Sequence, residues 1–273
     1  MASPFQRVSV YLPYMPTIVV SKKDPASVNI GEYLTENYFE KTDKTFGNYH
    51  VFKYGNADLI IIDSEHIYAD WLEERYPSDL YIVASRHSAE SGIPCLTVHT
   101  TGNWGDALYG GQSRTLSYAP AQHMLAALKY LAGHPLEGFS VSYEVTHHGP
   151  TLDTPVMFVE IGSTEEQWVR EDAAEIVGEA IMAALNPINA PAAIGIGGGH
   201  YAPRFTQIAL KKGVAFGHML PKYAFPFADE YMLRKAVERT VPKPRYYAMH
   251  GVPDEIKKIL AEIVEEYGLE RIK

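Results

Sequence analysis

A run of apolar residues that breaks into a glycine-rich loop is the feature that most constrains the fold of this chain. Residues 192–196 are apolar, Gly197 to Gly199 are consecutive glycines, and His200 follows them. Pro203 then stands where the first turn of a helix tolerates a missing N–H. The pattern predicts a strand, a tight loop and a helix. Because glycine lets backbone amides approach a ligand, three residues become candidates for substrate binding: Gly197, Gly198 and Gly199.

Two further apolar runs end in a histidine in the same way. Residues 214–218 end at His218, and residues 245–250 end at His250. In open α/β sheets, ligands bind beyond the carboxyl ends of parallel strands. If the three strands are parallel neighbours, His200, His218 and His250 converge at one site. The alternative, that each histidine is satisfied separately, stays open.

Strand and helix patterns alternate along most of the chain and predict an α/β protein. With 273 residues and 46% apolar content, the chain can bury a full core. Residues 58–63 and 80–85 read as strands, and residues 163–185 as a helix with a polar cap. We expect residues 1–16, which contain three prolines, to form an irregular extension. Residues 17–273 are expected to form a single α/β domain, with or without a small subdomain.

Charge and cysteine content limit the classes of function. The net charge of −9 argues against an indiscriminate nucleic-acid binder, but from residue 201 onward there are 13 Lys+Arg against 9 Asp+Glu, a balance of +4. Lys222 in this basic part is a candidate contact for substrate phosphates. A single cysteine, Cys95, excludes an intramolecular disulfide and suits a reducing cytoplasm. No apolar run approaches the ~18 residues of a membrane span, so we expect a cytoplasmic protein without a membrane partner.

Further candidate residues stand where predicted strands end. Residues 139–145 alternate in period two, and His147 and His148 follow. Consecutive strand residues point to opposite faces, so both histidines reach one site only if the strand has ended, as Gly149-Pro150 suggests. Glu160 lies near the end of the next apolar strand and is costly to bury unpaired. His99 holds a similar position beyond a strand end. Ser21 and Asp24, beyond the end of another predicted strand, are candidates for substrate binding.

Five motifs in order resemble the archaeal and plant type of D-aminoacyl-tRNA deacylase. They are Ser21-Lys-Lys-Asp24-Pro-Ala-Ser27, Glu144-Val-Thr-His147-His148-Gly-Pro-Thr151, Glu160-Ile-Gly-Ser163, Gly197-Gly-Gly-His200-Tyr-Ala-Pro203 and Gly217-His-Met-Leu-Pro221-Lys222. The resemblance extends from Ser21 to the C-terminus. It implies hydrolysis of the ester that links a D-amino acid, or glycine mischarged on alanine tRNA, to the terminal adenosine. It also implies a three-layer α/β/α fold with a mixed, largely parallel sheet, similar to phosphorylases and peptidyl-tRNA hydrolases, and a zinc cofactor.

Hydrolysis of this ester requires an activated water and stabilisation of an oxyanion. Zinc held by imidazoles and a carboxylate could supply both. The expected metal ligands are His148, Glu160, His200, His218 and His250, and the expected catalytic residues are His147, His148, His200 and His218. The chain has no HExxH spacing, so a metal-free alternative stays open, with one histidine as general base and the amides of Gly197–Gly199 as the oxyanion hole.

Other functional classes also remain at this point. One is a phosphorylase-like enzyme or a zinc peptidase that acts on a small substrate. Another is a non-catalytic tRNA- or nucleotide-binding module whose histidines are structural. We expect a monomer that binds the 3′ end of aminoacyl-tRNA as its substrate.

Overall fold

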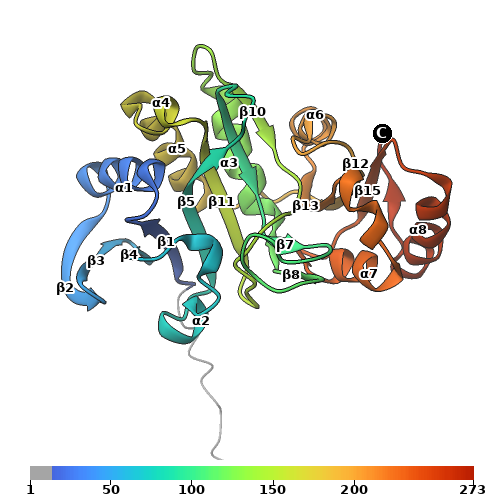
Figure 1. The fold of residues 1–273 in the computed structure, drawn as a ribbon, viewed down its shortest axis with the longest axis horizontal. Coiled ribbons are helices and arrows are strands. Elements are labelled where there is room, and N and C mark those ends of the chain that lie inside the picture. Colours follow the sequence, from blue (N-terminus) through green and yellow to red (C-terminus); the bar gives the residue numbers. More distant parts are fainter. Residues whose placement is uncertain (1–13) are drawn as a thin grey trace, which may run out of the picture.

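A computed structural model describes residues 14–273 and shows an α/β protein built on two sheets (Figure 1). The larger sheet is mixed and has the order β10-β6-β11-β5-β1-β4-β3-β2. Its strands are β1 (Pro16–Ser21), β2 (Glu40–Phe46), β3 (Tyr49–Tyr54), β4 (Ala57–Ile62), β5 (Leu80–Ser88), β6 (Cys95–His99), β10 (Ser140–Tyr143) and β11 (Val156–Ser163). The central strands β4, β1, β5 and β11 are all parallel neighbours, as their unbroken apolar runs predict.

The second sheet contains the glycine-rich loop and is parallel throughout. Its order is β13-β12-β15-β16, with β12 (Ala192–Gly197), β13 (Ala215–Leu220), β15 (Tyr246–His250) and β16 (Glu270–Arg271). The condition set out for the three apolar runs that lead to a histidine, that their strands are parallel neighbours, is therefore met. Two short ribbons complete the strands: β7 (Gly102–Asn103) with β8 (Thr115–Leu116), and β9 (Ala119–Pro120) with β14 (Thr240–Val241).

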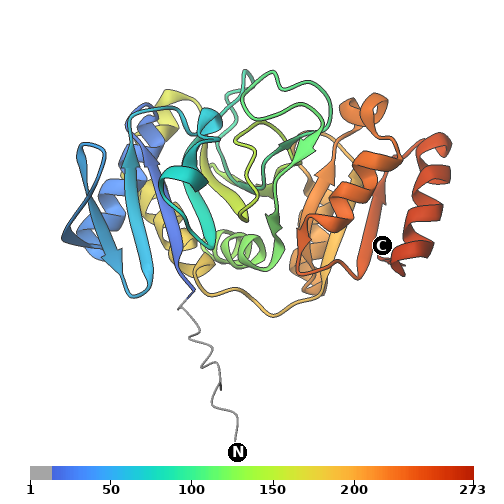
Figure 2. The same cartoon turned by 90° about the horizontal axis from the view of Figure 1, so that it is seen from below.

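Helices cover the sheets in layers (Figure 2). One face of the larger sheet packs against α1 (Pro25–Asn37), α3 (Ala121–Gly133) and α5 (Glu171–Ala184). Helix α3 also contacts the second sheet, which lies between α6 (Pro203–Lys212) on one face and α7 (Glu230–Glu238) and α8 (Asp254–Tyr267) on the other. Four shorter helices are η1 (His66–Tyr68), α2 (Leu72–Arg75), α4 (Glu165–Trp168) and η2 (Lys222–Phe227).

The main apolar core passes from one sheet to the other. It includes Ile82 of β5, Leu125 of α3 and Phe216 of β13, all fully buried. This continuity agrees with the expected single domain over residues 17–273, which stays a prediction. The expected extension over residues 1–16 lies mostly outside the described residues, and β1 begins at Pro16, the last residue of that range. Among the described residues, no helix has the length and hydropathy needed to cross a bilayer.

The helix expected over residues 163–185 is interrupted. Thr164 and Gln167 form a reciprocal cap at the start of α4, as the sequence predicts, but α4 ends at Trp168 and α5 begins at Glu171. The side chain of Asn29 in α1 donates to the carbonyls of Trp168 and Arg170, both at 3.0 Å. These side-chain bonds satisfy carbonyl groups at the break and stabilise it.

Candidate active site

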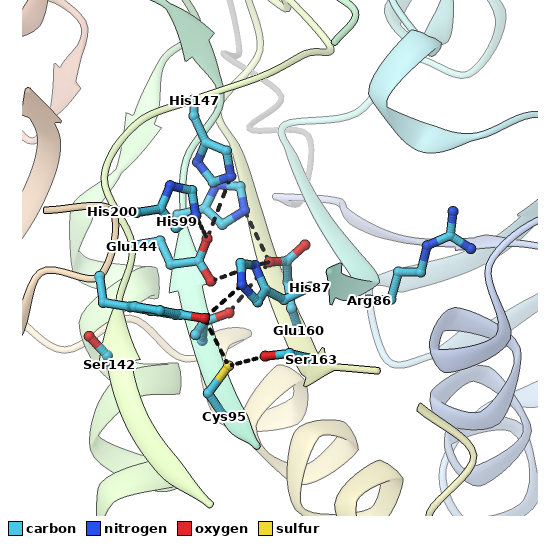
Figure 3. A network of polar contacts seen from close by, with 12 residues as sticks. Arg86, His87, Cys95, His99, Ser142, Glu144, His147, Glu160, Ser163 and His200 are labelled. Carbon is cyan, nitrogen blue, oxygen red and sulfur yellow. Dashed lines mark hydrogen bonds and ion pairs between the residues drawn. The ribbon is translucent and has the colours of Figure 1, made fainter. Parts of the chain in front are cut away.

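A cavity of about 550 Å³ lies beyond the carboxyl ends of β1 and β5, where the junction of the two sheets brings many ionisable side chains together. Its polar lining residues include Asp24, Glu65, His66, Arg86, His87, His147, His148, Glu160 and His200. Figure 3 shows the imidazoles of His87, His99, His147 and His200 gathered around the carboxylates of Glu144 and Glu160. The cavity therefore has the location expected for an α/β ligand site.

The paired histidines reach the cavity together because the strand before them has ended. Strand β10 stops at Tyr143, four residues before His147. His148 has φ of +40°, a left-handed conformation that is uncommon for residues other than glycine. With this backbone turn, both consecutive imidazoles line the same cavity. The predicted ending of the strand is confirmed.

Three imidazoles form a group whose potential ligand atoms lie within 4.8 Å of one another: His99, His147 and His148. In each ring Nδ1 faces a backbone carbonyl, at 3.1 Å from Thr100, 2.8 Å from Val145 and 2.6 Å from Gly149, respectively. A nitrogen that faces a carbonyl carries the proton, so Nε2 of each neutral ring keeps its lone pair. Metal-binding histidines are oriented in this way.

Glu144 is a fully buried carboxylate surrounded by imidazoles. His87 Nδ1 lies 3.0 Å from Oε1, while His200 Nε2 lies 3.0 Å and His147 Nε2 3.5 Å from Oε2. Burial alone would raise the pKa of Glu144, but the bonds from His200 and His87 hold that pKa well below its usual range. Glu144 is therefore ionised at neutral pH.

The histidines fall into two electrostatic classes. Burial lowers the pKa of His148 to about 3 and, with the neighbouring imidazoles, lowers the pKa of His147 well below its usual value. Burial also opposes the charged forms of His87 and His99, but Glu144 and Glu160 outweigh it and raise the pKa of both. His147 and His148 are thus neutral at pH 7, the state that can bind a metal ion.

The opposite wall of the cavity carries Asp24, Glu65, His66 and Arg86. Asp24 caps α1 by accepting from the Ser27 amide at 2.9 Å, and its other oxygen accepts from the Arg86 amide at 2.9 Å. Burial lowers the pKa of His66, whose Nε2 is 3.7 Å from Asp24. The Arg86 guanidinium lies 3.5 Å from Glu65. This wall combines acids with a cation.

His218 does not reach the cavity, contrary to its predicted role as a catalytic residue and metal ligand. Strand β13 continues two residues beyond it to Leu220, so His218 is inside the strand rather than at its end. The side chain is fully buried, with Nδ1 3.1 Å from the Thr146 hydroxyl and Nε2 2.9 Å from the Ser117 carbonyl. Both ring nitrogens are occupied by the protein itself, which is a structural role.

His250, predicted as a metal ligand, is also outside the cavity lining. It ends β15 as expected, but its side chain is exposed. Ser21, predicted to bind substrate, is buried, and its hydroxyl donates to the Ser64 carbonyl at 2.7 Å. Lys222 packs against Gly251 and is likewise absent from the lining. Of the substrate-binding residues predicted for the entrance of α1, the structure brings only Asp24 to the site.

The three glycines shape a loop instead of presenting amides to the cavity. Gly197 and Gly198 have φ of +97° and +92°, and a Cβ on Gly197 would lie 2.2 Å from the His250 carbonyl oxygen. The Gly198 amide already donates to that carbonyl at 3.0 Å. It therefore cannot donate to an oxyanion, and none of the three glycines lines the cavity. Their effect is to place His200 against Glu144.

Several residues of the cluster are missing from the predicted set, although the sequence carries a signal for most of them. Strand β5 is an apolar run that leads directly to Arg86 and His87, the same pattern that singled out His200. His99 shows the pattern too but was not placed among the expected ligands. Glu144 stands three residues before His147, inside a motif that the resemblance uses. His66 follows a polar stretch and has no such signal.

Comparison with known proteins agrees with the sequence motifs. The family model described as D-aminoacyl-tRNA deacylase matches residues 74–272. The D-aminoacyl-tRNA deacylase of Thermococcus onnurineus is 41% identical over 273 residues, covering 95% of this chain and 100% of that protein. The enzyme of the same name from Methanosarcina mazei is 37% identical, covering 94% and 91%. A crystal structure of a conserved protein of unknown function superimposes with a TM-score of 0.86 at 34% identity, covering 96% and 95%.

Proposed function

The chain belongs to the D-aminoacyl-tRNA deacylase family and hydrolyses D-aminoacyl-tRNA, and we propose that the reaction takes place in the cavity lined by His147, His148 and His200. The observation that carries this assignment is the convergence of five imidazoles and the buried carboxylates of Asp24 and Glu160 on one cavity, with His99 and Glu144 packed directly against this group. Outside a metal or catalytic site, such a density of buried ionisable groups is costly. The reaction releases a free D-amino acid and tRNA. We place the protein in the cytoplasm, where its substrate is made, and expect a monomer.

The donor set fits a zinc ion. We assign the ligands to Nε2 of His99, His147 and His148, with Glu160 as the adjacent carboxylate. The buried Nε2 of His99 lies 3.4 Å from Glu160 Oε2, so an imidazole and a carboxylate donor stand side by side, as in a zinc site. Bound zinc lowers the pKa of a water ligand to about 7 and polarises a carbonyl group.

His200 and Glu144 form the proton-transfer pair in this proposal. The ionised Glu144 orients His200 by accepting from its Nε2–H group, in the way a buried carboxylate positions a catalytic histidine. The other ring nitrogen, Nδ1, lies 3.5 Å from the Tyr223 hydroxyl and is available to take a proton from water. His200 then returns the proton to the ribose oxygen that leaves. His200 is thus assigned to catalysis and not to the metal.

The opposite wall suits the two charged ends of the substrate. Arg86 is a cation for a phosphate of the tRNA 3′ end, and the Asp24–Glu65 side offers carboxylates to the α-ammonium group. Glycine has no side chain, so a pocket that rejects L side chains by shape would also accept glycine mischarged on alanine tRNA.

The proposal is tested by following ester loss from D-tyrosyl-tRNA with the purified full chain. One arm uses chelator-treated protein, and a second restores zinc to it. Loss of activity with chelator and its return with zinc supports the whole assignment. Activity that is insensitive to chelator would exclude zinc from the mechanism and leave His200 as the general base. If the ester stays intact in every arm, including the arm with untreated protein, the proposed function is refuted.

A further inference from the structure

A second cavity, of about 500 Å³, lies beside the candidate active site, at the β2–β3 hairpin and the start of α2. Its lining includes Phe46, Tyr49, Asp63, Ser64, Trp71 and Arg75. None of these residues takes part in the proposed hydrolysis. The cavity is nearly as large as the catalytic one. The chemistry of its lining residues indicates which kind of ligand it binds.

The two cavities border the same chain segment. Ser64 lines the second cavity and the next residue, Glu65, lines the first. The Ser21 hydroxyl holds this segment against β1 by donating to the Ser64 carbonyl at 2.7 Å. The two cavities are therefore adjacent and are separated by the segment that carries Ser64 and Glu65.

The walls of the second cavity combine flat aromatic faces with an unpaired cation. The rings of Phe46 and Trp71 are inclined by 28° with centroids 6.3 Å apart, and the Arg75 guanidinium lies 5.0 Å from the Trp71 ring. Lys44 and Lys53 of the neighbouring strands lie 3.6 and 3.9 Å from Asp58, whereas Arg75 forms no ion pair within residues 14–273. Aromatic faces with cations beside them are the usual elements of single-stranded nucleic-acid sites.

Two polar side chains in the same walls have bonding capacity to spare. One carboxylate oxygen of Asp63 accepts from the Tyr49 hydroxyl at 2.5 Å, and the other oxygen accepts from no group within residues 14–273. The buried hydroxyl of Ser64 has no hydrogen-bond partner in the part of the chain that the structure describes. An acid that accepts from an exocyclic amine is a way of recognising cytosine.

We propose that this cavity binds the unpaired cytosine next to the terminal adenosine of tRNA, an inference that rests on the proposed function. The base stacks on the aromatic wall formed by Trp71, and its N4 amine donates to Asp63. Arg75 faces the phosphate between the cytidine and the adenosine. The active site would then hold only the aminoacylated adenosine, and the second cavity would secure the tRNA end.

The first test compares two substrates with and without the cytidine: D-tyrosyl-tRNA and D-tyrosyl-adenosine. Trp71→Ala should reduce kcat/KM for the tRNA at least about 5-fold through KM, and leave the adenosine ester unchanged. Trp71→Phe, which keeps a stacking face, should restore most of the loss. As a matched control, Tyr130→Ala removes a ring stacked on His134, at 4.0 Å between centroids, and should affect neither substrate. Equal losses on both substrates, or no loss on either, would overturn the inference.

The second test does not depend on turnover. Binding of the trinucleotides CCA and CUA to the full chain is followed by tryptophan fluorescence, with Asp63→Asn as the specificity variant. Uracil presents O4 where cytosine has its amine, so the wild type should prefer CCA and Asp63→Asn should lose or reverse that preference. An equal affinity for CCA and CUA would exclude Asp63 from base recognition. If CCA binds as predicted but D-tyrosyl-tRNA is not cut, the proposed function fails while the cytosine site stands.

Discussion

His200 Nε2 lies 3.0 Å from Glu144 Oε2, although the two residues are 56 positions apart and follow strands of different sheets. The backbone supports this contact, because the Val145 amide donates to the His200 carbonyl at 3.0 Å and Glu144 forms a bridge with Tyr201. The site is thus assembled where the second sheet docks on the first. Changes at this junction should affect the site's chemistry and its geometry together.

Glu144→Gln keeps the shape of the side chain but removes its charge. Since Glu144 holds His200 in position for proton transfer, we expect kcat for D-tyrosyl-tRNA to fall about 100-fold or more. The pKa of His87 should also fall, because Glu144 is the main group that raises it against burial. Ester hydrolysis and an NMR titration of His87 measure the two effects. Glu262→Gln, at an exposed position of α8 outside the cavity lining, is the control, and near-normal activity in Glu144→Gln would contradict the assigned role.

His148→Asn removes one proposed zinc ligand and is compatible with the backbone conformation at this position. Asparagine tolerates the left-handed conformation that His148 adopts, so the loop should keep its path. We expect zinc affinity to fall at least ~10-fold and activity to fall with it. His250→Asn, at an exposed position outside the cavity, should change neither. Zinc titration of both variants decides the ligand set, and a loss of zinc affinity in His250→Asn as well as in His148→Asn would favour the set predicted from sequence, which includes both residues.

Gly149→Ala tests the tight packing behind the histidine pair. An added Cβ would lie 2.3 Å from the Gly111 amide nitrogen and 2.4 Å from the Ile67 carbonyl oxygen. Both are backbone atoms, so no change of side-chain rotamer can relieve the clash. We expect a loss of about 2 kcal/mol in the free energy of unfolding. Gly133→Ala, at the end of α3 with no atom within 4 Å of the added Cβ, should stay within about 1 kcal/mol of wild type. Urea unfolding compares them, and equal stabilities would refute the packing argument.

His218 should make stability depend on pH. Burial lowers its pKa to about 4, whereas an unfolded histidine has a pKa of about 6.5. The unfolded state therefore binds the proton first, and the stability that neutral His218 contributes is lost as pH falls from about 6.5 toward 4. By linkage this amounts to about 2 kcal/mol between pH 7.5 and pH 5. In urea unfolding, His218→Gln should show a shallower decline over this range, and an unchanged decline would contradict the assignment.

The sequence predicts the fold and the active-site loops better than it predicts which side chains meet. Unbroken apolar runs identify buried parallel strands, and the turn at Gly149-Pro150 correctly indicates that β10 has ended before His147. The error at His218 has a simple cause, because apolar periodicity does not show that β13 continues for two more residues. Glu144 stands in a motif visible in the sequence, but only the docking of the two sheets surrounds its carboxylate with imidazoles. Long-range pairing of this kind has no signature in a single sequence.

The central claim is tested most directly by comparing D- and L-tyrosyl-tRNA at equal concentration with zinc-loaded protein. Loss of the ester is followed for both substrates, with Glu144→Gln as the site-specific variant. The account predicts rapid loss of the D-ester, little loss of the L-ester beyond its spontaneous rate, and a large reduction of the D-ester rate in Glu144→Gln. Equal rates for the two esters, or D-ester hydrolysis that Glu144→Gln leaves unchanged, would contradict it.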